Sequence, residues 1–176
     1  MNKVLLLSLA ATLAAGCATM RDMMPSAAKP TATASLTPTT GNTARGTVTF
    51  TQDGAGVRVR ANVAGLKPNA EHGFHVHEKG DCSSGDGMST GGHFNPAGKP
   101  HGAQSGEHHA GDMPSLQADA YGNASASFEL KGVSVGGAGA DLVGRGLIVH
   151  RDPDDYKTQP TGNAGPRIAC GVIAKS

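Results

Sequence analysis

Strict alternation of apolar and polar residues between Gly56 and Leu66 constrains the fold more than any other feature of the chain. Residues of one parity are apolar and those of the other are polar: Val57, Val59, Ala61 and Val63 against Arg58, Arg60 and Asn62. Because successive side chains of a β-strand point to opposite faces, this pattern predicts a half-buried antiparallel strand with one solvated face. Similar alternation or short apolar runs predict further strands at 46–51, 71–78, 124–130, 147–150 and 168–174.

Many short strands are also what the composition favours. The 176 residues include 26 glycines and no tryptophan, aromatic residues make up 3%, and no window shows helical periodicity. Seven or eight strands joined by turns and two long irregular stretches predict an all-β Greek-key sandwich or barrel. The net charge of +1 and the lack of a basic stripe give no reason to expect a nucleic acid as partner.

The first 16 residues have the pattern of an export signal. Lys3 supplies a positive charge, a short apolar run follows, and small residues lead directly to Cys17. This order resembles a bacterial lipoprotein signal, in which Cys17 becomes the lipidated first residue of the mature protein. The alternative is ordinary signal cleavage near Ala15, which leaves Cys17 as a free thiol.

A tether is predicted between Cys17 and the globular domain. Residues 18–41 are rich in Thr, Ala, Ser and Pro and show no apolar periodicity, so we expect residues 17–41 to be disordered. A weak edge strand is the alternative, but Pro25, Pro30 and Pro38 argue against it. The predicted domain boundaries are therefore 1–16, 17–41 and 42–176.

Two histidines on one strand are the first candidate for chemistry. In Phe74-His75-Val76-His77 both imidazoles share one face, whereas Phe74 and Val76 share the other. Imidazoles so placed are ready metal ligands. Two solvated histidines on a polar strand face are the alternative, and this segment alone does not decide between them.

The 35 residues from Gly80 to Pro114 form a long stretch without regular patterning that needs an organising centre. Within 20 residues it contains three imidazoles and a carboxylate, which suit a tetrahedral Zn²⁺: His93, His101, His109 and Asp112. His108 competes with His109, but the His-x-x-Asp spacing favours His109. A solvated His-rich loop is the alternative.

The cysteine count gives a further constraint. The chain has three cysteines, and lipidation of Cys17 leaves Cys82 and Cys170 as an even pair. In an exported chain this pair should form a disulfide that joins the long loop to the last strand. Two thiolate metal ligands are the less favoured alternative.

Several motifs together resemble the copper/zinc superoxide dismutases, in register from about residue 42 to 174. They are Gly73-Phe74-His75-Val76-His77-Glu78, Gly92-His93-Phe94-Asn95-Pro96, His109-Ala110-Gly111-Asp112, Val149-His150 and the run from Gly162 to Ile173. The resemblance implies an eight-stranded antiparallel Greek-key barrel. It also implies a disulfide between Cys82 and Cys170.

The same resemblance implies a ligand set for each metal. Copper would be bound by His75, His77, His93 and His150, and zinc by His93, His101, His109 and Asp112, with His93 as the bridge. Arg167 would attract and orient a small anion beside the copper. Asp154 would link one copper ligand to one zinc ligand, although Asp152 and Asp155 lie close by.

The activity that the resemblance implies is dismutation of superoxide to dioxygen and hydrogen peroxide by redox cycling of the copper, with zinc bracing the bridging histidine. The expected cofactors are one copper and one zinc per subunit, and the expected partners are the superoxide anion and a membrane reached through the lipid anchor. The expected location is the periplasm, anchored to the outer membrane, and a homodimer is one possible assembly. The alternative is an exported lipoprotein that binds copper and zinc without catalysis.

Overall fold

The computed structural model describes residues 28–176, and the signal and lipidation predictions lie outside that range. Its elements are β1 (Thr31–Pro38), β2 (Arg45–Asp53), β3 (Gly56–Ala64), β4 (Glu71–His72), β5 (Phe74–His77), the 3-10 turn η1 (Met88–Thr90), β6 (Leu116–Gln117), β7 (Ala124–Lys131), β8 (Gly146–His150), β9 (Arg167–Val172) and β10 (Ala174–Lys175). In this part of the chain no helix has the length and apolar character needed to cross a bilayer.

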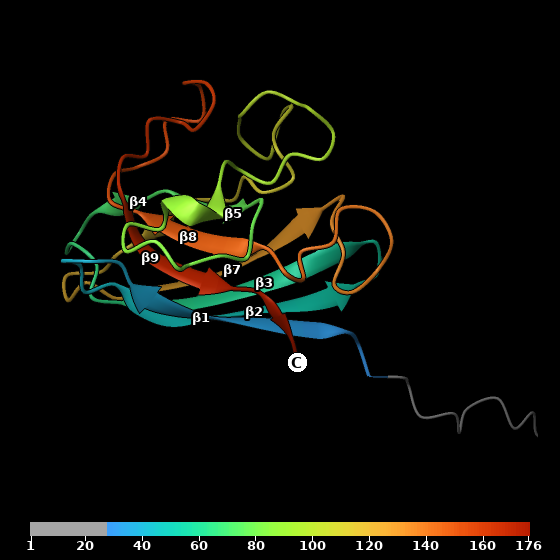
Figure 1. Cartoon of the computed structure of the whole chain (residues 1–176), viewed down its shortest axis with the longest axis horizontal. Coiled ribbons are helices and arrows are strands. Elements are labelled where there is room, and N and C mark those ends of the chain that lie inside the picture. The colour runs from blue at the N-terminus through green and yellow to red at the C-terminus, as the bar shows by residue number, and fades with distance from the viewer. Residues whose placement is uncertain (1–27) are drawn as a thin grey trace, which may run out of the picture.

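One curled antiparallel sheet of eight strands forms the body of the molecule (Figure 1). Its order is β5-β8-β9-β1-β2-β3-β7, with β10 paired to β1, while β4 and β6 form a separate two-stranded sheet. The chain runs through β1, β2 and β3 as a meander, crosses to β5, returns to β7 beside β3 and crosses again to β8. These crossovers confirm the predicted all-β Greek-key architecture.

The inner face of the sheet is the apolar core that the alternation predicted. Val57, Val59 and Ala61 of β3 are buried, whereas Arg60 and Asn62 on the other parity are exposed. A two-residue turn with Gly54 joins β2 to β3, so that Phe50 of β2 pairs with Val59 of β3. The core therefore lies inside the curl, and the two long loops leave the sheet together on one side (Figure 1).

The prediction of a disordered tether through residue 41 is wrong for the segment that forms β1. This strand lies between β2 and β9, and its inward residues Ala32, Ala34 and Leu36 are almost fully buried. Its prolines are compatible with the strand, because Pro30 precedes it and Pro38 ends it. At these two positions the missing N–H removes no hydrogen bond from the interior of the sheet. The globular domain therefore begins before residue 42.

Candidate metal centre

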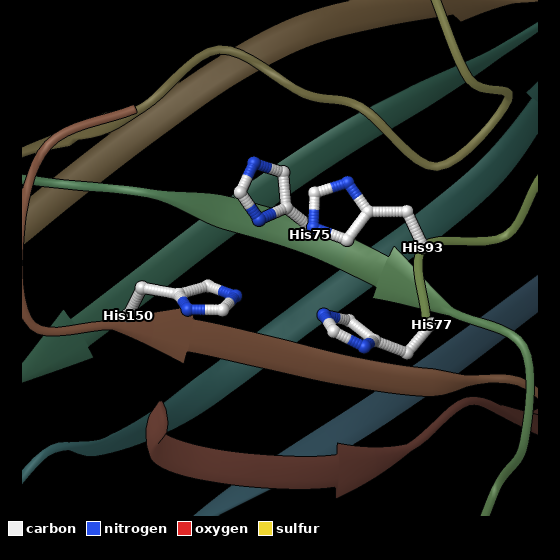
Figure 2. Close-up of side chains that lie close together, drawn as sticks. All are labelled: His75, His77, His93 and His150. Atoms are coloured by element: carbon white, nitrogen blue, oxygen red, sulfur yellow. The ribbon is translucent and has the colours of Figure 1, made fainter. Parts of the chain in front are cut away.

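Three segments that are distant in sequence bring four imidazoles together (Figure 2). His75 and His77 project from β5, which pairs with β8, and β8 ends at His150. A bulge between Val149 and His150 shifts the register there, and His93 enters from the long loop through a bridge to His77. All four side chains are buried, and their ligand atoms lie within 4.8 Å of one another.

In the described part of the chain, each of these four rings has one nitrogen held by a hydrogen bond and one nitrogen without a partner. The outer nitrogens bond to backbone carbonyls or carboxylates: His75 Nε2 to Asp154 at 2.8 Å, His77 Nδ1 to Gly91 O at 3.0 Å, His93 Nδ1 to Asp112 at 2.7 Å and His150 Nδ1 to Gly165 O at 2.9 Å. Four inner nitrogens are buried and have no hydrogen-bond partner among residues 28–176: His75 Nδ1, His77 Nε2, His93 Nε2 and His150 Nε2. Buried polar atoms are rarely left unpaired, so this arrangement fits a metal ion held by oriented imidazoles.

A second cluster lies directly beside the first. It comprises His93, His101, His109 and Asp112, all of them buried. The carboxylate of Asp112 lies 2.7 Å from His93 Nδ1, 3.0 Å from His101 Nδ1 and 3.2 Å from His109 Nδ1. Three ring nitrogens around one carboxylate match the donor set of a closed tetrahedral zinc site.

His93 is the one residue common to both clusters. Its Nδ1 faces Asp112 and lies 3.4 Å from Nδ1 of His109, while its Nε2 is the unpartnered atom on the side of His75, His77 and His150. A single imidazole thus offers one nitrogen to each group of ligands.

Asp154 connects the two clusters through hydrogen bonds to one histidine of each. Its carboxylate oxygens accept hydrogen bonds from Nε2 of His75 at 2.8 Å and from Nε2 of His101 at 2.9 Å. Gly162 lies against both Asp154 and His101, and its φ of +65° and lack of a Cβ are what allow this approach. Of the three neighbouring aspartates only Asp154 makes this link, since Asp152 pairs with Arg151 and Asp155 bonds to Lys157 and Thr158.

The environment favours the metal-binding protonation states of the first cluster. Burial lowers the pKa of His75 to about 4, despite the opposing hydrogen bond to Asp154, and lowers the pKa of His150 to about 3. Both imidazoles are therefore neutral at pH 7, and a neutral imidazole is the form that binds a metal ion.

In the second cluster the pKa of His101 is shifted in the opposite direction. Burial opposes protonation of His101, but the carboxylates of Asp112 and Asp154 outweigh it and raise the pKa to about 9. The pKa of Asp112 is lowered below its usual range, because hydrogen bonds from His101 and His93 overcome the effect of burial. The two carboxylates thus favour positive charge at His101, which a bound cation would supply in place of the proton, whereas burial lowers the pKa of His109 in the same cluster.

Arg167 begins β9 and lies opposite His150 in the pairing of β8 with β9. Its guanidinium is half-buried, and Nη1 donates to Gly87 O and to Thr90 Oγ1, both at 2.8 Å, while Nη2 donates to Gly91 O at 2.7 Å. Burial lowers the pKa of Arg167 from its ordinary value, and the charge of Asp86 opposes this shift. A fixed cation therefore borders the four-histidine cluster.

The structure brings together every histidine and aspartate that the sequence favoured as a metal ligand, and it leaves out the competing His108 and the two cysteines. His108 lies outside both clusters, and its Nδ1 bonds to Gly106 O. Cys82 and Cys170 form the disulfide that the cysteine count predicted, with their Cα atoms 5.9 Å apart.

Sequence reasoning missed the residues that join the two long loops. Gln159 accepts a hydrogen bond from the backbone N–H of His101 at 2.8 Å and donates to its carbonyl at 2.9 Å. The Tyr156 hydroxyl accepts from the N–H of Ser115 at 2.8 Å and donates to its hydroxyl at 3.0 Å. Nothing in the local pattern marks Gln159 or Tyr156, because their partners lie more than forty residues away.

The fold and the site together define a class: a Greek-key β-barrel with two adjoining metal-ligand clusters that share one histidine. The family model described as copper/zinc superoxide dismutase matches residues 44–173. The chain belongs to the copper/zinc superoxide dismutase family.

Individual relatives agree with this assignment. The protein described as superoxide dismutase [Cu-Zn] 2 of Aquifex aeolicus is 45% identical over 124 residues, which cover 68% of this chain and 72% of that protein. Two solved structures of a SOD-like protein from Bacillus subtilis, one of them a double mutant, are each 35% identical. Their TM-scores are 0.73 for the double mutant and 0.71, and the matches cover 81% and 80% of this chain and 96% of each of those chains.

Proposed function

We propose that this protein removes superoxide by dismutation, with copper bound by the first cluster and zinc by the second. The copper ligands are His75, His77, His93 and His150, and the zinc ligands are His93, His101, His109 and Asp112. The observation that carries the proposal is the position of His93, which directs one ring nitrogen to each cluster beside the fixed guanidinium of Arg167. A site that only stored metal would need neither feature.

The overall reaction converts two superoxide anions and two protons into one dioxygen and one hydrogen peroxide. When bound, copper supplies one-electron redox chemistry between two accessible oxidation states, and zinc supplies a redox-inert positive charge. The protein supplies the rest: a rigid set of ligands, attraction of an anion and a source of protons.

Arg167 performs the anion-binding part of this task. Its guanidinium attracts the negatively charged substrate and orients it by hydrogen bonds next to His150, its neighbour across the strand pair. We assign the proton-transfer part to His93, because the lone pair of its Nε2 can hold a proton whenever it does not hold the metal ion, and that proton is then available to the reduced product. Asp154 keeps His75 and His101 in fixed ring orientations.

Measuring superoxide removal by protein loaded with both metals tests this proposal. At full occupancy of both sites we expect a second-order rate constant of about 10⁸–10⁹ M⁻¹ s⁻¹, close to the diffusional limit for an efficient enzyme. Protein loaded with zinc alone is the matched control and should be inactive, because zinc has no redox chemistry. A doubly loaded protein without activity would support the alternative, a copper- and zinc-binding protein that does not catalyse.

We further propose that the protein is exported and anchored to a bacterial outer membrane, facing the periplasm, by lipid on Cys17. The support is the signal-like sequence of residues 1–16, and a disulfide, which is typical of oxidising compartments, is consistent with export. Intact mass spectrometry of the mature protein should give a chain that starts at Cys17 and carries acyl groups. A chain that starts elsewhere, or an unmodified Cys17, would contradict this proposal.

A further inference from the structure

A buried threonine hydroxyl lies between the turn η1 and the guanidinium of Arg167. Thr90 is fully buried, and its Oγ1 donates a hydrogen bond to Gly87 O at 2.9 Å. The same oxygen accepts from Nη1 of Arg167 at 2.8 Å. Because its proton is already committed to Gly87, the hydroxyl presents a lone pair to the guanidinium.

The hydrogen bonds to the turn leave part of the guanidinium free. An arginine side chain has five N–H donors, and here three acceptors take one each: Gly87 O, Thr90 Oγ1 and Gly91 O. Within residues 28–176, Nε–H and the remaining N–H of Nη2 have no hydrogen-bond partner. Two donors on a half-buried cation are thus available to a small anion.

The same turn also holds a ligand of the first cluster. The carbonyl of Gly91 accepts from Nη2 of Arg167 at 2.7 Å and from Nδ1 of His77 at 3.0 Å. Rotation of the guanidinium away from the turn would therefore change its position relative to the ring of His77.

We propose that Thr90 is a positioning residue, whose hydroxyl fixes Nη1 of Arg167 so that the free N–H groups point to an anion bound at the four-histidine cluster. This inference rests on the proposed function, because it concerns how the superoxide anion is received. Thr90 acts through Arg167 and touches neither the substrate nor the ligand nitrogens.

The two branches of the threonine side chain have separate partners, which allows them to be tested separately. The γ-methyl group packs against β8 so closely that a Cβ added at Gly146 would lie 2.8 Å from it. The hydroxyl bonds to Gly87 and Arg167. Thr90→Val keeps the branched shape and removes the hydroxyl, whereas Thr90→Ser keeps the hydroxyl and removes the methyl group.

Azide is a suitable probe, because it is a small anion whose binding to a copper protein is followed by optical absorption. In protein loaded with both metals, Thr90→Val should weaken azide binding about tenfold, as expected for loss of one hydrogen bond to a charged group. Thr90→Ser should stay within about twofold of the wild type, since it retains that bond. Thr49→Val, at an exposed position of β2, controls for the chemical change itself and should have no effect.

Modification of Arg167 by phenylglyoxal, measured by peptide mass spectrometry on metal-free protein, provides a second readout. Thr90→Val should increase the rate of modification, and Thr90→Ser should leave it close to that of the wild type. Thr90→Ala removes the same hydroxyl without a β-branched replacement, so it replaces the valine variant if that chain does not fold.

The order of the variants decides the outcome. If Thr90 acted through packing alone, Thr90→Ser would bind azide more weakly than Thr90→Val, and Thr90→Val would bind it nearly as tightly as the wild type. That order of azide affinities would overturn the inference. Equal azide affinities and equal rates of Arg167 modification in the two variants would also overturn it. Azide binding and arginine modification require no turnover, so a protein that fails to remove superoxide defeats the proposed function while these two measurements still decide the role of Thr90.

Discussion

Replacing His93 with alanine should weaken both metal sites at once. Its Nδ1 faces the carboxylate of Asp112 at 2.7 Å, and its Nε2 faces the first cluster without a partner, so the substitution removes one ligand from each group. Loss of a partner that only orients a ligand already costs 10–100-fold in metal affinity, so loss of a ligand should cost at least about 100-fold for zinc. Superoxide removal should fall to background. Competition with chelators, followed by counting the metal ions retained per chain, measures the effect.

Two single-cluster variants are the matched controls for His93→Ala. His109→Ala removes a ligand from the second cluster only, and His77→Ala removes one from the first cluster only. We expect each of these variants to lose one metal and to retain most of its affinity for the other. Wild-type zinc affinity in His93→Ala would falsify the bridging role of His93, whatever happens to the copper.

Removing the disulfide should lower the free energy of unfolding by about 4–5 kcal/mol. Cys82 and Cys170 are 88 residues apart, and in the chain-entropy model a crosslink over such a distance restricts the unfolded chain by that amount. Replacing both cysteines with serine avoids a single leftover thiol at the buried position of Cys170. Unfolding by denaturant measures the change, and it should be performed with chelator present, because bound metal would stabilise the folded state on its own.

Two measurements distinguish the effect of the crosslink on the unfolded chain from a loss of packing at the substituted side chains. The wild-type protein treated with reductant should lose nearly the same free energy as the double serine variant. The dependence of the free energy on denaturant should become steeper, because the unfolded chain expands when the crosslink is removed. A loss below about 1 kcal/mol would contradict the chain-entropy account for this protein.

Strand and ligand patterns could be predicted from the sequence wherever the signal is local. The alternation in Gly56–Leu66 identified β3, because one face of that strand is apolar and the other is polar. His75 and His77 could be placed on one face for the same reason. The partners of His93 followed from the resemblance of several motifs to one family, and only the structure shows which nitrogen faces which cluster.

The features that could not be predicted from the sequence involve residues whose role depends on partners far away in the chain. Strand β1 was missed because the apolar positions of its alternation are alanines apart from Leu36, and its burial comes from β2 and β9. Thr90 was missed because a single threonine in an irregular loop has no pattern, and its partner Arg167 is 77 residues away. Local periodicity carries no information about such contacts.

The position of β1 in the sheet has a consequence for the order in which the protein is made. β1 is the first strand of the sheet along the chain, yet one of its neighbours is β9, which begins at Arg167. A chain that emerges amino end first cannot pair these two strands until residues 167–172 have been made, and contacts so distant in sequence also form slowly. Pairs such as β1 with β2 can form before this segment exists, but the curled sheet cannot close between β1 and β9 until it does.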